Sequence, residues 1–84
     1  MPESVADRVK RVTAKVLKVD PVRISPEARF AADLGAESIQ SVELLASFEE
    51  EFDITMNEDA ALSVKTVGGA IEFISKCVRE QHGD

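Results

Sequence analysis

The chain has 84 residues, enough for one domain with a single modest core, because chains of this length bury only about 60% of the surface that they expose when unfolded. A composition of 44% hydrophobic and 31% charged residues is typical of a globular protein rather than a disordered one. Sixteen acidic and ten basic residues give a net charge of −6, which argues against nucleic acid as a partner. No apolar run approaches the roughly 18 residues that a membrane-spanning helix requires.

Cysteine and histidine are scarce in this sequence. Cys77 has no second cysteine for an internal disulfide, and with His82 it supplies two of the four ligands of a structural zinc site. No basic and apolar leader with a cleavage site is recognisable near the N-terminus. We therefore expect a cytoplasmic location and a fold held together by helix packing. The length predicts a single domain over residues 1–84, and the acidity of the chain favours a monomer.

Valine recurs at helical spacing near the N-terminus. Five valines among the first 19 residues follow one another at intervals of three or four, which places them on one face of a helix. Ser4 followed by Asp7 resembles a capping box with aspartate in place of glutamate. Pro21 is expected to end this helix, because the residue before a proline is displaced from helical geometry. The first helix is therefore predicted from about Ser4 to Lys18.

A long segment without sustained periodicity follows, from Pro21 to Glu37, and it contains two prolines. Loops longer than about 12 to 15 residues in compact domains are usually functional or disordered. Apolar residues are spread along this one, so an ordered loop is expected. Its predicted anchors in the core are Val22, Ile24, Phe30 and Leu34.

The second long helix is predicted from Ser38 to Phe52. Its apolar residues recur at the spacing of one buried helix face. They are Val42, Leu44, Leu45, Phe48 and Phe52.

Two further helices are predicted beyond a short connection. Asn57 is a favourable N-cap for a short helix that ends near Leu62, and Thr66 can cap a last helix that ends near Glu80. The remaining Gln-His-Gly-Asp tail is expected to be frayed. No strand pattern is present, so the predicted fold is all-α. It is a small four-helix bundle of three long helices and one short helix, with a long loop between helices one and two.

The charge is unevenly distributed along the chain. Residues 1–29 contain seven basic and four acidic side chains, whereas residues 30–64 contain nine acidic and no basic ones. The last 20 residues contain three of each. The middle of the chain therefore forms a negative surface, which either keeps the domain in solution or docks basic partner proteins.

The sequence offers no constellation for catalysis or metal binding. Nucleophilic and acid-base catalysis require a nucleophile beside an oriented base, and the only imidazole is that of His82 in the tail. Cys77 falls on the apolar stripe of the last helix, so a buried structural residue is expected rather than a reactive thiol. The acidic segment from Glu49 to Asp59 lacks the glycine and ligand order of a calcium-binding EF-hand loop. We expect neither an enzyme nor a metal site.

Ser38 lies at the start of the acidic second helix and has two possible roles. Serine is a favoured N-cap, so its hydroxyl can accept an N–H of the first turn. Helix N-termini also favour anions, so a phosphate ester on this hydroxyl would be well placed. The residues alone favour the capping role and leave the second role open.

The sequence around Ser38 resembles the attachment motif of acyl carrier proteins, which is Asp-Ser-Leu preceded by Leu-Gly and followed by Val-Glu-Leu. The matching run is Asp33-Leu34-Gly35-Ala36-Glu37-Ser38-Ile39-Gln40-Ser41-Val42-Glu43-Leu44. The similarity extends through Glu49-Glu50-Glu51-Phe52 and Thr66-Val67, and length, acidity and helix order agree along essentially the whole chain. The chain therefore resembles a stand-alone acyl carrier protein.

The resemblance implies a covalent cofactor and a carrier function. By similarity, Ser38 is the hydroxyl to which a phosphopantetheinyl transferase couples 4′-phosphopantetheine. The thiol of that group would hold acyl intermediates as thioesters, and the protein itself would catalyse nothing. Its other partners would be acyl-transferring and acyl-elongating enzymes of fatty-acid, lipid or related acyl biosynthesis. The resemblance also implies a cavity between the helices that shelters the acyl chain.

In such carriers the second helix presents its acidic side chains to basic docking patches of partner enzymes. The matching positions are Glu37, Ile39, Gln40, Glu43, Ala46, Glu49 and Glu50. The spacing of Glu43, Ala46 and Glu50 places these three on one outward strip. This location favours a docking role for the negative surface, with weak and salt-sensitive binding.

Several residues depart from the pattern of fatty-acid carriers. Glu37 replaces the usual Asp, Ile39 replaces Leu, Gln40 replaces a frequent second acid, and Ala46 replaces a larger apolar residue such as Met. Asn57 occupies the place of a common proline. These changes lead to the hypothesis of a specialised carrier that serves a dedicated pathway. The alternatives are an aminoacyl or polyketide carrier, and an unmodified acidic helical adaptor protein.

Overall fold

The structure, a computed structural model, describes residues 3–83. Its elements in chain order are α1 (Val5–Leu17), the 3₁₀ turn η1 (Pro21–Arg23), α2 (Ser38–Phe52), α3 (Glu58–Leu62) and α4 (Val67–His82). Within the described residues, strand-like pairing is limited to one isolated bridge between Arg29 and Thr66. The predicted all-α bundle of three long helices and one short helix, with a long loop after the first, is confirmed.

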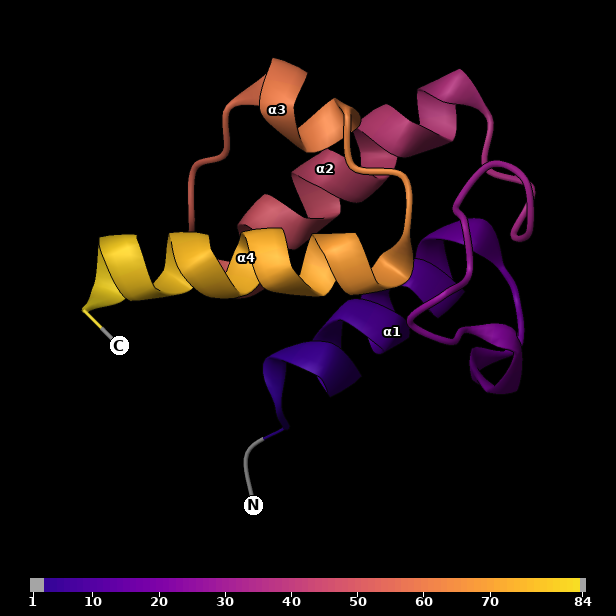
Figure 1. The fold of residues 1–84 in the computed structure, drawn as a ribbon, viewed down its shortest axis with the longest axis horizontal. Helices are drawn as coiled ribbons and strands as arrows, with labels where there is room; N and C mark the ends of the chain where they lie inside the picture. The colour runs from indigo at the N-terminus through magenta and orange to yellow at the C-terminus, as the bar shows by residue number, and fades with distance from the viewer. Residues whose placement is uncertain (1–2, 84) are drawn as a thin grey trace.

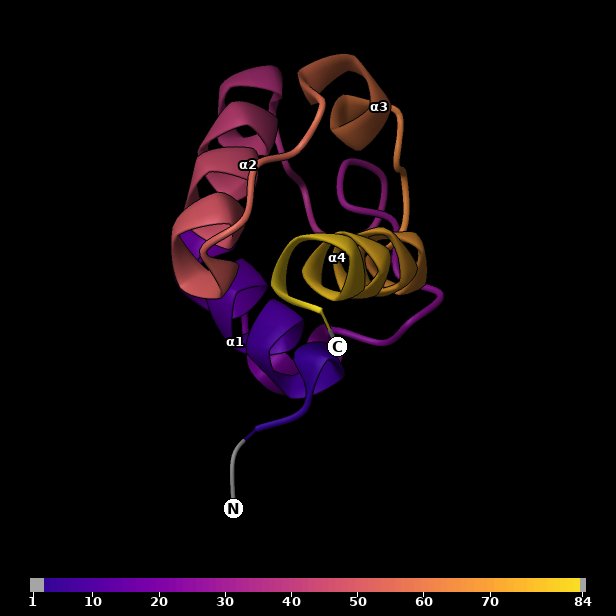
Figure 2. The ribbon, with the colours of Figure 1, turned by 90° about the vertical axis from the view of Figure 1, so that its left-hand side faces the viewer.

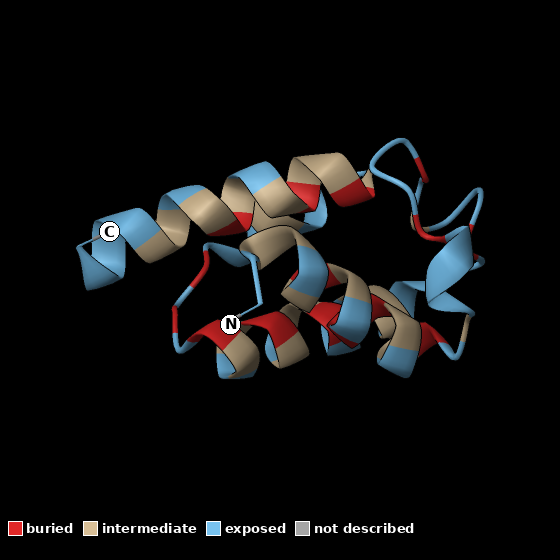
Figure 3. Ribbon diagram, turned by 90° about the horizontal axis from the view of Figure 1, so that it is seen from below, coloured by how far each residue is buried: buried red, intermediate tan, exposed pale blue. Residues whose placement is uncertain are grey.

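The three long helices surround one apolar core. Helices α1 and α2 run in opposite directions, α4 packs against α1, and α3 lies beside α2 on the side away from α1 (Figures 1 and 2). The buried positions of the helices form stripes that face inward (Figure 3). The long loop and the connection after α2 also contribute buried residues. The buried apolar residues are Val9, Val12, Leu17, Ile24, Ala28, Leu34, Ala36, Leu44, Phe48, Phe52, Ile54, Met56, Val67, Ala70 and Ile74.

Three predicted helix starts are confirmed by their hydrogen bonds. The side-chain oxygens of Ser4, Asn57 and Thr66 each accept a backbone N–H from the residue three positions on, at 2.9 to 3.1 Å. Each bond satisfies one of the N–H groups that have no partner within the helix.

Helix α1 ends by a different device from the one predicted. Lys18 adopts a left-handed conformation with φ of 57°, and its N–H donates to the carbonyl oxygen of Ala14. The helix therefore ends at Leu17, before the proline can act on it. Pro21 instead opens the short 3₁₀ turn, which begins after Asp20 as its N-cap.

The long loop is ordered, but one predicted anchor is wrong. Ile24 and Leu34 are buried and Phe30 is half-buried, as expected. Val22, in contrast, is 90% exposed. It lies inside η1, where successive side chains point in different directions around a tight turn, so Val22 and Ile24 cannot both face the core.

The buried face of α2 is displaced from the predicted one. It is centred on Leu44, Phe48 and Phe52, which follow one another at intervals of four, whereas Leu45 is half-buried. Val42 lies about 200° around the helix from Leu44 and is 49% exposed, so its assignment to the core is wrong.

The C-terminal segment is ordered, so the predicted fraying is wrong for the residues described. Helix α4 continues to His82. Gln81 accepts the Thr55 N–H through Oε1 at 2.8 Å and donates through Nε2 to the Thr55 carbonyl at 2.6 Å. His82 Nε2 lies 2.6 Å from the carbonyl oxygen of Asp53. Asp84 lies outside the described residues.

Backbone hydrogen bonds join the long loop to the start of α4. Val67 donates its N–H to Ala28 at 3.0 Å, and Gly68 donates to Pro26 at 2.8 Å. A Cβ atom on Gly68 would lie 3.0 Å from the Pro26 carbonyl oxygen, and one on Gly69 would lie within 3.1 to 3.2 Å of side-chain atoms. Both glycines therefore permit close approach, which offsets the helix propensity that they lack.

Candidate functional site

Ser38 is exposed and is the first residue of α2. The N-cap position belongs to Glu37, whose backbone is extended and whose N–H donates to Oε1 of Gln40 at 3.0 Å. The capping role that the residues alone favoured for Ser38 is therefore wrong. The hydrogen bond between Glu37 and Gln40 caps the first turn in place of Ser38. The Ser38 hydroxyl is therefore accessible at the start of the helix.

The preceding loop fixes the place where Ser38 emerges. Leu34 and Ala36 are buried on either side of Gly35, whose φ of 72° lies in the left-handed region that glycine adopts without strain. The Ala36 N–H also donates to the carbonyl oxygen of Phe30 at 2.8 Å. Because Ala36 is anchored in the core only two residues earlier, Ser38 is held at the surface by a short, ordered stretch of chain.

Asp33 orders this loop from its other side. Its carboxylate accepts the backbone N–H of Arg29 at 2.8 Å and the Nε of the same residue at 3.2 Å. The backbone hydrogen bond from Arg29, followed by that from its guanidinium, lowers the pKa of the Asp33 carboxyl. Asp33 is thus committed to the loop and does not reach toward Ser38 as a free base.

The position of Ser38 suits an anionic substituent. The first N–H groups of a helix have no intrahelical acceptor, and the helix dipole adds a partial positive charge at this end. Ser38 and Ile39 contribute such N–H groups at the start of α2. A phosphate ester on the Ser38 hydroxyl would therefore meet free donors and a favourable field.

An apolar cavity of about 280 Å³ opens beside the first turns of α2. Ser41, one turn from Ser38, is among its lining residues, and Arg29 and Lys65 add polar groups. Most of the lining is apolar and comes from α2, α3, α4 and the adjoining loops. These residues are Phe30, Ala31, Ala32, Leu44, Leu45, Phe48, Met56, Ala61, Leu62, Val64, Ala70, Phe73 and Ile74.

Five of the seven positions predicted for docking are exposed, and two are half-buried. Glu37, Ile39, Glu43, Ala46 and Glu50 are exposed, and Ile39 is 69% exposed. Gln40 and Glu49 are half-buried.

Two of these side chains have internal partners. The Gln40 amide oxygen accepts the Glu37 N–H, as described above, and the Glu49 carboxylate accepts the Met56 N–H at 2.8 Å. Glu43, Ala46 and Glu50 are exposed, with the spacing that places them on one strip of α2.

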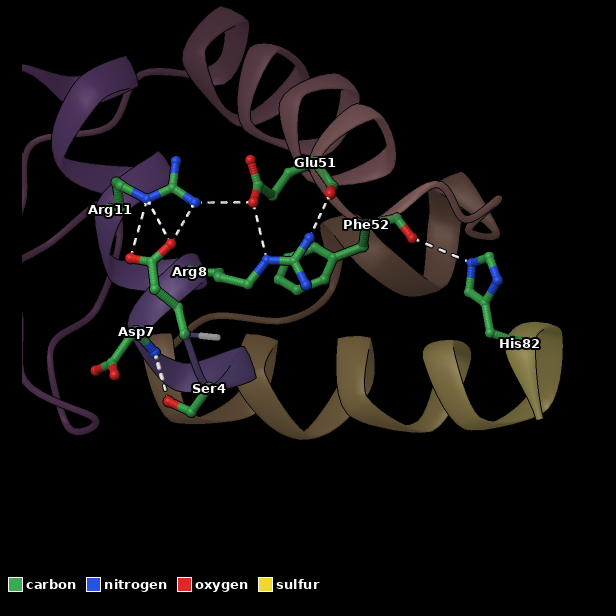
Figure 4. Close-up of polar contacts among 8 residues, drawn as sticks. Ser4, Asp7, Arg8, Arg11, Glu51, Phe52 and His82 are labelled. Atoms are coloured by element: carbon green, nitrogen blue, oxygen red, sulfur yellow. Dashed lines mark hydrogen bonds and ion pairs between the residues drawn. The ribbon is translucent and has the colours of Figure 1, made fainter. Parts of the chain in front are cut away.

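The opposite end of α2 is held by an ionic cluster that the sequence analysis missed (Figure 4). Arg8 donates through Nε to the Glu51 carboxylate at 2.9 Å and through Nη2 to the Glu51 carbonyl at 2.6 Å. Its guanidinium also lies 4.3 Å from the centre of the Phe52 ring. Arg11 donates to the same carboxylate at 2.9 Å and pairs with Glu3. Glu51, despite its acidic neighbours, is thus a structural partner of α1.

These contacts change the acidity of Glu51. Hydrogen bonds from Arg8 and then Arg11 lower the pKa of its carboxyl. The cluster therefore ties α1 to the C-terminal end of α2, far from Ser38, and favours the ionised carboxylate.

Two remaining features concern metals and membranes. Among residues 3–83, no three or more histidine, cysteine, aspartate or glutamate side chains form a group that could hold a metal ion. No helix of the described chain has both the length and the apolar character needed to cross a membrane.

The single cysteine of the chain, Cys77, is half-buried in α4, and burial raises the pKa of its thiol.

Comparison with known proteins identifies the family. The model of the phosphopantetheine attachment site matches residues 7–74. Over 72 residues, the chain is 43% identical to an acyl carrier protein of Caulobacter vibrioides, in an alignment covering 86% of this chain and 92% of the relative. The corresponding protein of Phenylobacterium zucineum is 44% identical with 86% and 91% coverage. That of Sinorhizobium fredii is 47% identical with 86% and 92% coverage.

The family match spans the loop, the whole of α2 and the first half of α4, so it includes Ser38 and all the residues that line the cavity of about 280 Å³. Proteins of this family are carriers that are modified with phosphopantetheine. The chain belongs to the acyl carrier protein family.

Proposed function

We propose that Ser38 is the residue that carries 4′-phosphopantetheine, and that the protein delivers acyl intermediates to partner enzymes of fatty-acid, lipid or related acyl biosynthesis. The observation that carries this proposal is the exposed Ser38 hydroxyl at the first position of α2, inside the segment that matches the attachment-site model. When attached, this group supplies the terminal thiol on which acyl groups are held as thioesters.

The residues of α2 fit this role in two ways. The free N–H groups of its first turn stabilise negative charge on the oxygen atoms bound at Ser38. The cavity that begins near Ser41 offers an apolar environment for an acyl chain. Each methylene that leaves water for such an environment contributes about 0.8 kcal/mol. The carrier can therefore shelter its cargo while remaining ready to release it.

The exposed acids of α2 serve as the docking surface in this proposal. Glu43 and Glu50 attract basic patches on a phosphopantetheinyl transferase and on acyl-transferring enzymes, and Ile39 adds an apolar contact beside the serine. Exposed ion pairs contribute only about 0.2 to 1 kcal/mol each, so the complexes form and dissociate rapidly.

Differences from the usual docking residues support a specialised carrier. Gln40 brings no charge and is bound to Glu37, and Ala46 leaves the centre of the strip without a large apolar side chain. A general fatty-acid ketosynthase and malonyl transferase should therefore use this protein less efficiently than the acyl carrier protein of Caulobacter vibrioides. Equal efficiency with both carriers would contradict the specialisation.

The attachment itself is tested by intact mass. The protein is incubated with coenzyme A and a broad-specificity phosphopantetheinyl transferase, together with Ser38→Ala and the control Ser41→Ala. The parent and the control should gain one phosphopantetheine, and Ser38→Ala should gain none while remaining folded. No gain in a folded, unmodified parent would contradict the proposal and favour an unmodified adaptor protein.

A further inference from the structure

An open hollow of about 490 Å³ lies between α1 and α2, on a different side of α2 from the apolar cavity of about 280 Å³. Val12, Val16 and Ala46 give it an apolar lining. Lys15 lies on its α1 wall, and Glu43 and Glu50 lie on its α2 wall. The hollow therefore combines an apolar lining with charges of opposite sign on its two walls.

The register of the two helices places Lys15 opposite the middle of the acidic strip. Helices α1 and α2 run in opposite directions (Figure 1), and Arg11 contacts Glu51 at 2.9 Å. Four residues advance a helix by about 6 Å. One turn forward along α1 from Arg11 is Lys15, and one turn back along α2 from Glu51 is Ser47. Lys15 thus faces Ser47, which lies between Glu43 and Glu50 in the sequence.

The charges around the hollow differ in whether they are already paired. Arg11 forms ion pairs with Glu3 and Glu51, as Figure 4 shows for the cluster at this end of the hollow. Lys15, Glu43 and Glu50 are exposed, and within residues 3–83 none of them has an ion-pair partner. One free cation and two free anions are therefore available to a binding protein.

We propose that this hollow docks a segment of a partner protein that inserts one apolar side chain between a basic and an acidic residue. The basic residue pairs with Glu43 or Glu50, the acidic residue pairs with Lys15, and the apolar side chain packs over Ala46. Lys15 is a specificity-determining residue in this arrangement, because it repels partners whose docking patch is uniformly basic. The inference rests on the proposed function, since it concerns the proteins to which a carrier docks.

Two short helical peptides test this charge pattern. Both are alanine-based and amidated, with a central leucine flanked by arginine on one side of the helix and by either glutamate or lysine on the other. Each is titrated into the isotopically labelled, unmodified protein at low salt, and amide chemical shifts are followed by NMR. We expect the shifts of Lys15, Ala46 and Ser47 to move, with the glutamate peptide binding about threefold or more tighter than the lysine peptide.

Three variants separate the parts of the proposal. Lys15→Glu should reverse the preference between the peptides, whereas Lys76→Glu, which makes the same change on an exposed position of α4, should leave it unchanged. Ala46→Met should fill the hollow and weaken both peptides. Equal affinity for the two peptides, shifts confined to other surfaces, absence of binding, or a preference that survives Lys15→Glu would overturn the proposal.

One further outcome distinguishes the occupant. If the same residues shift when the parent alone is concentrated, a second copy of the chain fills the hollow and the proposal of a different partner protein fails. The experiment uses unmodified protein and does not depend on Ser38. Failure of the peptide test and failure of the modification test are therefore independent results.

Discussion

Gly68 donates its backbone N–H to the carbonyl oxygen of Pro26 at 2.8 Å, and this bond joins the first turn of α4 to the long loop that leads to Ser38. The contact is close because Gly68 has no side chain: a Cβ atom there would lie 3.0 Å from the same oxygen. Glycine lowers helix stability by about 1 kcal/mol relative to alanine. At this position the hydrogen bond that fixes the loop offsets that loss. Packing around the loop, rather than helix propensity, decides the residue at this position.

Gly68→Ala is therefore expected to lower the free energy of unfolding by about 1 kcal/mol, although alanine is the better helix former. The loss arises because the Pro26 carbonyl must move away from the added methyl group. Urea denaturation of the variant and the parent measures it, with Glu72→Ala as a control on an exposed position of α4. Increased stability in Gly68→Ala would mean that the loop moves aside freely.

Thr13 is fully buried, and its hydroxyl oxygen has no hydrogen-bond partner among the described residues. A buried polar group without a partner is costly, so Thr13→Val, which keeps the shape, should stabilise the fold by about 1 kcal/mol.

The matched variant Thr13→Ser keeps the hydroxyl and removes the methyl group. It should therefore destabilise the fold, by about 0.8 kcal/mol for the lost buried carbon. Thermal unfolding of the two variants distinguishes the contributions. A loss of stability in Thr13→Val would show that the hydroxyl has a partner after all.

The ion pairs of Glu51 make part of the stability dependent on pH. Hydrogen bonds from Arg8 and Arg11 lower the pKa of this carboxyl from its ordinary value of 4.5. The unfolded chain then binds the proton more readily than the folded chain. The contribution of Glu51 is therefore complete well above pH 4.5 and is lost as the pH falls through the lowered pKa.

Glu51→Gln should accordingly be less stable than the parent near neutral pH, by about 1 kcal/mol, and the difference should shrink as the solution is acidified below the ordinary pKa. Urea denaturation at a series of pH values measures this convergence. Asp33, whose pKa is lowered as well, is present in both proteins and does not affect the comparison. A difference that stays constant from neutral to acidic pH would exclude this role for the Glu51 carboxylate.

Filling the apolar cavity of about 280 Å³ should reduce the stabilisation that an attached acyl chain gives to the fold. Ala61 lines the cavity and its neighbour Ala60 does not, although both are half-buried in α3. In the parent, a medium-length acyl group on the carrier should raise the melting temperature above that of the acetyl form, because its methylenes leave water. Ala61→Leu should diminish this increase and Ala60→Leu should preserve it. An equal increase in all three proteins would place the acyl chain outside the cavity.

Features governed by neighbouring residues could be predicted from the sequence. The caps at Ser4, Asn57 and Thr66 each depend on a contact three residues along the chain, and all three are confirmed. The helix that starts at Ser38 was likewise predicted at the correct residue. The capping role that the residues alone favoured for Ser38 is wrong, because Glu37 occupies the N-cap position instead.

Features that depend on distant residues were missed. Gln81 holds the connection after α2 through Thr55, 26 residues away, and Arg8 reaches Glu51 across 43 residues. Val22 is apolar yet faces solvent, since its direction is set by the turn in which it lies. The family resemblance implies a cavity between the helices, but its position and lining depend on packing between α2, α3 and α4, which no spacing within one segment determines.

Peptide mapping identifies the residue that receives phosphopantetheine. After incubation of the protein with coenzyme A and a phosphopantetheinyl transferase, proteolysis and tandem mass spectrometry locate the added mass on individual residues. We expect all of the added mass on Ser38. Added mass on Ser41, Ser47 or another residue, with Ser38 unmodified, would exclude Ser38 as the attachment site.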